Sequence, residues 1–119
     1  DESECLSQSP PKGTSYIDAV YVFAPMDKET METSGANAVS SILASKCSVS
    51  LDNVKSWKVK DVTDSFVSET MTGKKTALWV RVSVPNERAS KLTTVLGDRA
   101  SLKMCLERIR ILPSTRSQS

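Results

Sequence analysis

Four segments of the chain carry the alternating or β-branched pattern that is typical of strands. The clearest is residues 76–84, where every second side chain is a large aliphatic one. Residues 56–63 also alternate, with Trp57 and Val59 predicted on one face and the lysines between and after them on the other. The other two segments are residues 16–24, which are apolar on both faces as in a central strand, and residues 107–112.

Two segments show apolar side chains at the three- and four-residue spacing of helices. The first begins at Asp27 and ends near Lys46, and the second starts at Asn86, which is the expected N-cap. Residues 101–112 fit either a helix or a strand. We assign a strand to residues 107–112, because a sheet built in this way needs a fourth member.

The resulting order is strand, helix, strand, strand, helix, strand, which with right-handed crossovers gives a ferredoxin-like α+β sandwich. We expect an antiparallel four-stranded sheet with both helices on one face, the first strand in the centre and the last strand at an edge. A length of 119 residues suits a single domain. We place a flexible N-terminal arm at residues 1–14, the domain at residues 15–113 and a C-terminal tail at residues 114–119.

The charge balance and the residue inventory argue against several classes of protein. Sixteen Lys and Arg face fourteen Asp and Glu, a net charge of +2, which disfavours a nucleic-acid-binding protein. The chain has no histidine, so the commonest general base and metal ligand is missing. No apolar run reaches the roughly 18 residues that a membrane span needs. We therefore expect a monomer that is not an enzyme and that uses no metal or cofactor.

Three cysteines lie far apart in the sequence, at Cys5, Cys47 and Cys105. They fit one disulfide with one free thiol, or three reduced thiols that pack in the core. The polar start of the chain is typical of a mature secreted protein, in which a cysteine in such a segment is best explained as a tether. Among the three pairings we favour Cys5 with Cys47, which would close a loop of about 40 residues and stabilise the domain by roughly 3–4 kcal/mol.

The sheet face opposite the helices is the candidate binding surface. Trp79 and Arg81 are predicted to point toward it, and aromatic and arginine side chains on an uncovered face are typical of protein interfaces. The first strand adds one of two apolar pairs, either Tyr21 with Phe23 or Val20 with Val22. The alternatives are that the N-terminal arm folds over this face, or that Trp79 lies flat against it.

The end of the chain is the second candidate feature. The last strand runs directly into an extended tail that begins at Pro113. An extended peptide can enter a protease cleft by pairing with a strand of the enzyme. A frayed terminus is the alternative interpretation of the same residues.

Together, the element order, the strand at 76–84, the helix after Pro85 and the tail after Leu112 resemble a subtilisin propeptide. The resemblance covers Tyr16 to about Arg116. It implies that the open sheet packs on two surface helices of the protease and that the tail lies in the active-site cleft. Asp61, Asp64 or Glu69 would be the acidic caps of those helices, and the cleft residues would be Ile111, Leu112, Pro113 and Ser114.

The cysteines and the preceding arm depart from the propeptide pattern and favour a free-standing mimic. The resemblance then implies a secreted inhibitor of a subtilisin-like serine protease, of the kind stored in micronemes. A non-catalytic extracellular interaction module of the SEA type is the alternative, although the Gly-Ser pair of its self-cleaving members is missing. A small proline isomerase of the parvulin type is a third reading, which the lack of histidine disfavours.

Overall fold

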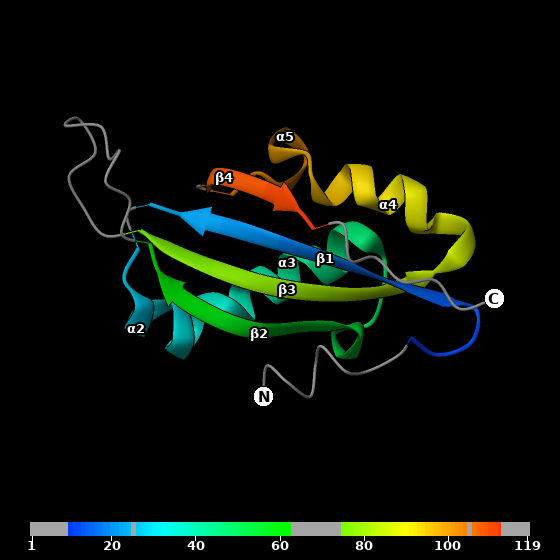
Figure 1. Ribbon diagram of the computed structural model, residues 1–119, viewed down its shortest axis with the longest axis horizontal. Helices are drawn as coiled ribbons and strands as arrows, with labels where there is room; N and C mark the ends of the chain where they lie inside the picture. The colour runs from blue at the N-terminus through cyan, green and yellow to red at the C-terminus, as the bar shows by residue number, and fades with distance from the viewer. Residues whose placement is uncertain (1–9, 25, 63–74, 105, 113–119) are drawn as a thin grey trace.

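The four predicted strands form one antiparallel sheet in the structure, a computed structural model that describes residues 10–24, 26–62, 75–104 and 106–112. The strand order is β2-β3-β1-β4 (Figure 1). The strands are β1 (Thr14–Phe23), β2 (Val54–Asp61), β3 (Thr76–Pro85) and β4 (Leu106–Ile111). The first strand is therefore central and the last lies at an edge, which confirms the ferredoxin-like α+β arrangement expected from the sequence.

The first helical region extends over residues 28–47 and has three parts. A short turn of α-helix, α2 (Lys28–Thr30), leads into a π-helical segment, η1 (Met31–Gly35), and then into α3 (Ala36–Cys47). Asp27 caps the start, because its Oδ1 accepts a hydrogen bond of 2.7 Å from the backbone N–H of Thr30. The predicted start at Asp27 is therefore confirmed, and the helix ends one residue beyond the predicted Lys46.

The second helical region differs from the prediction at its start. Asn86 is not an N-cap: it opens a 3-10 turn, η3 (Asn86–Arg88), that precedes α4 (Ala89–Leu96). Its side-chain oxygen instead accepts a hydrogen bond from the Ser15 hydroxyl, which ties the start of the helix to β1. Residues 101–112, which fitted either a helix or a strand, contain the end of a short helix, α5 (Arg99–Leu102), followed by the strand β4. One further element, the 3-10 turn η2 (Leu51–Asn53), precedes β2.

Both long helices pack on one face of the sheet, and α3 lies behind it in the view of Figure 1. The main core fills the space between them with fully buried side chains, among them Ile17, Leu43, Leu78 and Leu96. At its centre the hydroxyl of Tyr21 donates a hydrogen bond of 2.8 Å to the backbone carbonyl of Leu96, at the end of α4. This bond satisfies a carbonyl that the helix itself leaves without a partner.

Cys47 belongs to this core. The structure has Cys47 as a free cysteine with no exposed surface, while Cys5, its expected disulfide partner, lies outside the described residues. Cys47 is buried because it lies in the last turn of α3, on the side that packs against the sheet. Burial raises the pKa of the Cys47 thiol, because the low-dielectric core disfavours the thiolate.

A β-bulge in β2 corrects the predicted alternation of that strand. The register with β3 shifts between Ser56 and Lys58, so that Trp57 is an extra residue. After the bulge, Lys58 lies opposite Trp79 and Val59 packs against the main core. The prediction that Trp57 and Val59 share one face is therefore wrong, because the extra residue interrupts the period of two on which it rested.

Candidate functional site

The candidate site is the sheet face that carries no helix, which we call the helix-free face. The strand register arranges its side chains in rows that cross all four strands. One row runs Lys58, Trp79, Val20, Arg110, and the next runs Lys60, Ala77, Val22, Arg108. Each row therefore has a lysine at the β2 edge, an arginine at the β4 edge and apolar side chains between them.

The middle of this face is an apolar cluster. Val20, Val22 and Ala77 are at most 9% exposed, and three half-buried side chains pack against them: Val62, Trp79 and Leu112. Of the two apolar pairs considered for β1, Val20 and Val22 thus lie on the helix-free face, whereas Tyr21 and Phe23 belong to the main core. The centre of the face is therefore covered rather than bare, and its accessible part consists of the surrounding side chains.

A buried ion pair lies next to this apolar cluster. Arg81 Nε is 2.7 Å from Asp18 Oδ1, and Arg81 Nη2 donates to Asp18 Oδ2 at 3.1 Å. The Arg81 guanidinium also lies over the ring of Tyr16, with 4.6 Å between Cζ and the ring centroid. Arg81 was expected to contact a partner, but it is 5% exposed and its guanidinium is engaged inside the domain.

A second ion pair joins β4 to the start of β3. Lys75 Nζ lies 2.7 Å from Glu107 Oε1, and the lysine side chain is 6% exposed against 25% for the glutamate. The bond holds the edge strand β4 to the residue that precedes β3, across the end of β1. The two ion pairs, Asp18 with Arg81 and Glu107 with Lys75, thus each neutralise one carboxylate on the strands of the sheet.

Two tryptophans and a lysine form a half-buried group on the face. The rings of Trp57 and Trp79 lie 6.5 Å apart at an interplanar angle of 59°, an arrangement typical of aromatic pairs. Lys58 places its Nζ 4.8 Å from the centroid of the Trp79 ring, within cation–π distance. The bulge in β2 makes this group possible, because it brings Trp57 and Lys58 to the same side of the strand.

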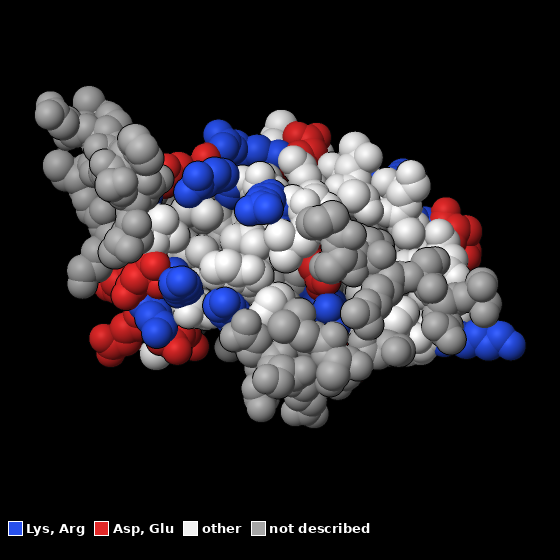
Figure 2. Space-filling view, in the orientation of Figure 1, with Lys and Arg blue, Asp and Glu red and all other residues white. Residues whose placement is uncertain are grey.

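The remaining cations of the two edges are exposed. Lys55 and Lys60 extend from β2, and Arg108 and Arg110 extend from β4. In the space-filling view, blue side chains lie over β4 and over β2, with uncharged atoms between the two groups and red side chains beside the blue ones at the end of β2 (Figure 2). Both edges of the face thus carry exposed cations, although the chain as a whole has a net charge of only +2.

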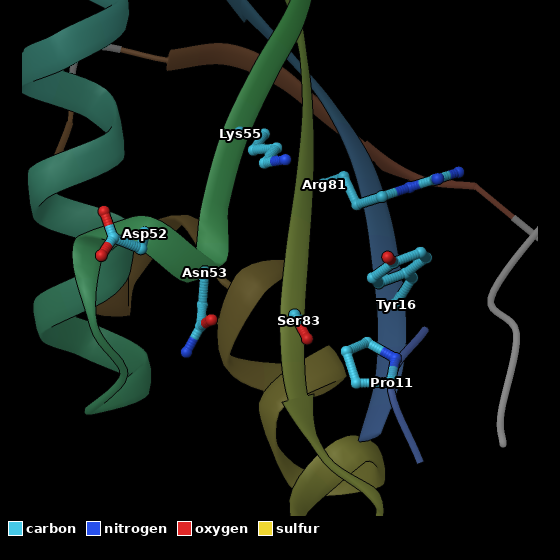
Figure 3. Close-up of a pocket in the computed structure, with 7 residues that line it drawn as sticks. All are labelled: Pro11, Tyr16, Asp52, Asn53, Lys55, Arg81 and Ser83. Carbon is cyan, nitrogen blue, oxygen red and sulfur yellow. The ribbon is translucent and has the colours of Figure 1, made fainter. Parts of the chain in front are cut away.

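A shallow cavity of about 160 Å³ opens at the end of the face near η2. It is lined by Pro11, Tyr16, Asp52, Asn53, Lys55, Arg81 and Ser83 (Figure 3). Arg81, which pairs with Asp18, reaches from β3 across β1 beside Tyr16, so that these two side chains form one side of the cavity. The cavity offers charged and hydrogen-bonding groups at its rim, and it is too small for most drug-sized ligands, which occupy roughly 300–1,000 Å³.

The residues expected from the propeptide resemblance have different surroundings. Asp61 is exposed at the end of β2, as a helix cap would be. Ile111 packs against the main core, and Leu112 packs against the apolar cluster of the helix-free face, so both are half-buried within the domain. Four further residues, Asp64, Glu69, Pro113 and Ser114, lie outside the described residues.

Comparisons with protein-family models, with curated proteins and with solved structures found no match for this chain. Within the described ranges, no helix has the length and apolar character needed to cross a membrane. In the same part of the chain, histidine, cysteine and carboxylate side chains form no group of three or more that could hold a metal ion.

Sequence reasoning missed the cations along the two edges of the helix-free face and the ion-pair partner of Arg81. The signal for the ion pair was present, since Asp18 is the one charge in an otherwise apolar strand segment and a buried carboxylate needs a cation. The alternation of Arg108 and Arg110 with isoleucines was also visible. This alternation does not show that the two arginines share a face with Lys58 and Lys60, because the bulge in β2 leaves no clear mark in the sequence.

Proposed function

We propose that this chain is a secreted inhibitor of a subtilisin-like serine protease. It docks by the accessible part of the helix-free face and places the residues that follow β4 in the active-site cleft. The ferredoxin-like fold with one face free of helices supports this proposal, since such a face leaves room for a second macromolecule.

One observation carries the proposal, the way in which the chain leaves the domain. The backbone N–H of Leu112 donates a hydrogen bond of 2.8 Å to the carbonyl of Asp18 on β1. This bond continues the pairing of β4 one residue past its end and fixes the chain at the border of the helix-free face. A segment that starts from a fixed point loses less entropy when it binds in extended form, which favours affinity.

Residues 113–119, including Pro113 and Ser114, are proposed to occupy the cleft, and Asp61 is proposed to approach a helix N-terminus of the protease. A carboxylate at such a site contributes about 0.3–1 kcal/mol when it is exposed. The greater part of the affinity would come from the sheet face and the tail. The inhibitor itself needs no catalytic group, because it acts by occupying the cleft.

The test is a titration of a purified subtilisin-like protease with the full chain, measuring hydrolysis of a chromogenic peptide. We expect inhibition at micromolar concentration or below. Removal of residues 113–119 should weaken inhibition, while removal of residues 1–9 serves as the matched truncation. Unfolding in urea shows whether both variants keep the stability of the full chain. Absence of inhibition by the full chain at micromolar concentration would contradict the proposal.

A second candidate is a protein-interaction module that inhibits nothing. The low exposure of Val20, Val22 and Ala77 favours it, because a covered centre reduces the apolar area left for tight docking. Binding to the inactive form of the protease, with its catalytic serine replaced, separates the two candidates. An interaction module would bind that form equally well with or without residues 113–119.

A further inference from the structure

We infer that the helix-free face recognises an acidic protein surface, one that presents carboxylates on both sides of an apolar strip. The inference deepens the proposed function, because it names the chemistry of the docking partner, and it rests on that function for the choice of a protease as the first partner. The argument begins with the rows of side chains that cross the sheet.

Both ends of each row are cationic. Lys60 of β2 and Arg108 of β4 end one row, and Lys58 and Arg110 end the neighbouring row. Lys55 adds a further cation on β2, opposite Arg81. Four of these five side chains are exposed, and Lys58 is half-buried over the Trp79 ring. The two edges of one face therefore carry a local positive charge that is larger than the net charge of the whole chain.

The carboxylates of the same strands do not compensate this charge. Asp18 of β1 binds Arg81, and Glu107 of β4 binds Lys75. β3 carries no acidic residue, and Asp61 of β2 lies opposite Thr76, in the row that faces the main core. Within the described strands, the acidic groups near the face are thus engaged by other cations. The exposed cations of the two edges, Lys55, Lys60, Arg108 and Arg110, are therefore available to act on a partner.

The spacing of the two edges defines the shape of the partner. Four neighbouring strands at their usual separation place the β2 and β4 side chains about 14 Å apart. Between them lies the apolar cluster of Val20, Val22 and Ala77 with the half-buried Trp79, and Val62 and Leu112 pack against this cluster from the continuations of β2 and β4. An apolar centre with a charged rim is the usual anatomy of a protein–protein interface. The surface of the partner that matches this face carries one group of carboxylates on each side of an apolar ridge.

This pattern favours a protein over a membrane or a nucleic acid. Insertion into lipid needs protruding apolar side chains, and the exposed large hydrophobic residue of the described chain, Leu51, lies in η2 rather than on the face. A nucleic acid needs a continuous basic track, whereas the apolar strip separates the two cationic edges here. Charges arranged in this way steer encounter with an oppositely charged surface and accelerate association.

The experiment compares two double charge reversals that change the net charge equally. The face variant, Lys60→Glu with Arg110→Glu, reverses one cation on each edge of the helix-free face. The helix variant, Lys46→Glu with Lys91→Glu, reverses two exposed cations on α3 and α4, on the opposite side of the sheet. Circular dichroism and urea unfolding confirm that both variants fold. All three proteins are titrated against a subtilisin-like protease from about 0.05 M to about 0.3 M NaCl.

We expect the native chain to associate more slowly with the protease as salt increases. The face variant should associate about tenfold more slowly at low salt and lose most of its salt dependence, while the helix variant should behave like the native chain. Equal behaviour of the two variants, or an association rate that salt does not change, would overturn the inference. Inhibition that persists in that case would leave the proposed function standing.

A second probe makes the inference independent of any protease. Oligo-glutamate peptide is added to isotope-labelled protein, and the amide resonances are followed by NMR. We expect shifts that gather at Lys58, Lys60, Arg108 and Arg110, that disappear in the face variant and that persist in the helix variant. Their absence would overturn the inference. Stronger binding to phosphatidylserine vesicles or to single-stranded DNA than to the peptide would also overturn it, since the occupant would then be another macromolecule.

Discussion

Arg81 and Asp18 face each other across the ladder of β1 and β3 and are joined by two hydrogen bonds, at 2.7 and 3.1 Å. Both residues are at most 5% exposed. A buried ion pair of this kind contributes little more than well-packed apolar residues would, but the loss of one partner leaves an uncompensated charge. The pair therefore makes the centre of the sheet sensitive to single substitutions.

The first prediction follows from this relationship. Asp18→Asn and Arg81→Met should each lower the free energy of unfolding by about 3–5 kcal/mol. The double variant should be less destabilised than the sum of the two, with a coupling of about 0.5–3 kcal/mol. Urea unfolding measures all three, with Arg110→Met as an exposed control that changes stability by about 0.5 kcal/mol or less. Strict additivity would show that the two side chains act independently.

The hydroxyl of Tyr21 provides a prediction on stability at high pH. Tyr21→Phe should lower the free energy of unfolding by about 1–2 kcal/mol at neutral pH, because the carbonyl of Leu96 loses its partner. Burial raises the pKa of Tyr21 above its usual value of 10. The unfolded chain therefore loses this proton first, and the contribution of Tyr21 is full below pH 10 and declines as the pH rises above it.

The measurement is urea unfolding of the native chain and of Tyr21→Phe from neutral to alkaline pH. The difference between the two proteins isolates Tyr21, because every other titrating group is common to both. We expect this difference to shrink above pH 10. A difference that stays constant across that range would show that Tyr21 titrates alike in the folded and unfolded chain.

The thiol of Cys47 should be unreactive in the folded protein. It has no exposed surface and burial raises its pKa, so both access and thiolate are lacking. Alkylation followed by peptide mass spectrometry should label Cys47 slowly in buffer and rapidly in concentrated urea. Rapid labelling of Cys47 in buffer would mean that the end of α3 opens readily, and a Cys47 peptide cross-linked to Cys5 would contradict the free thiol.

The pair of Lys75 and Glu107 gives a prediction with a built-in contrast. Glu107→Gln should destabilise the domain by about 1.5–3 kcal/mol, because it leaves the buried ammonium of Lys75 without a counter-charge. Lys75→Met should cost more, since it leaves a carboxylate whose Oε2 is already buried without a hydrogen-bond partner and whose Oε1 then loses the lysine. Thermal unfolding of both variants measures the contrast. Equal destabilisation would mean that the packing of the side chains, not the charge, matters here.

The sequence pattern predicted the fold to a large extent because it rested on long segments with a clear period. The strand β3 and the start of the first helix at Asp27 follow from alternation and from a capping side chain. The details that failed depend on tertiary structure. Asn86 has the chemistry of an N-cap, but its side chain bonds Ser15, a partner that is 71 residues distant in the chain.

The sequence predicted which face of the sheet is the candidate site, but it did not reveal how the charged side chains on that face are paired. The side on which Trp79 lies followed from alternation within β3, and Arg81 was correctly placed on the same face. Whether that face would accept a partner at Arg81 depended on Asp18, which meets it only through the register of β1 with β3. Registers join segments far apart in the chain, so a single sequence read locally does not reveal them.

The bulge at Trp57 sets the phase of β2. A regular strand that kept Trp57 would continue the period of two past Ser56, so that Lys58 and Lys60 would turn inward and Val59 would turn to solvent. Deletion of Trp57 would instead straighten β2 and leave Lys58 and Lys60 opposite the same residues of β3, with the loss of the tryptophan pair. The one residue of Val54–Asp61 that pairs with nothing on β3 therefore decides which side chains of β2 a partner can meet.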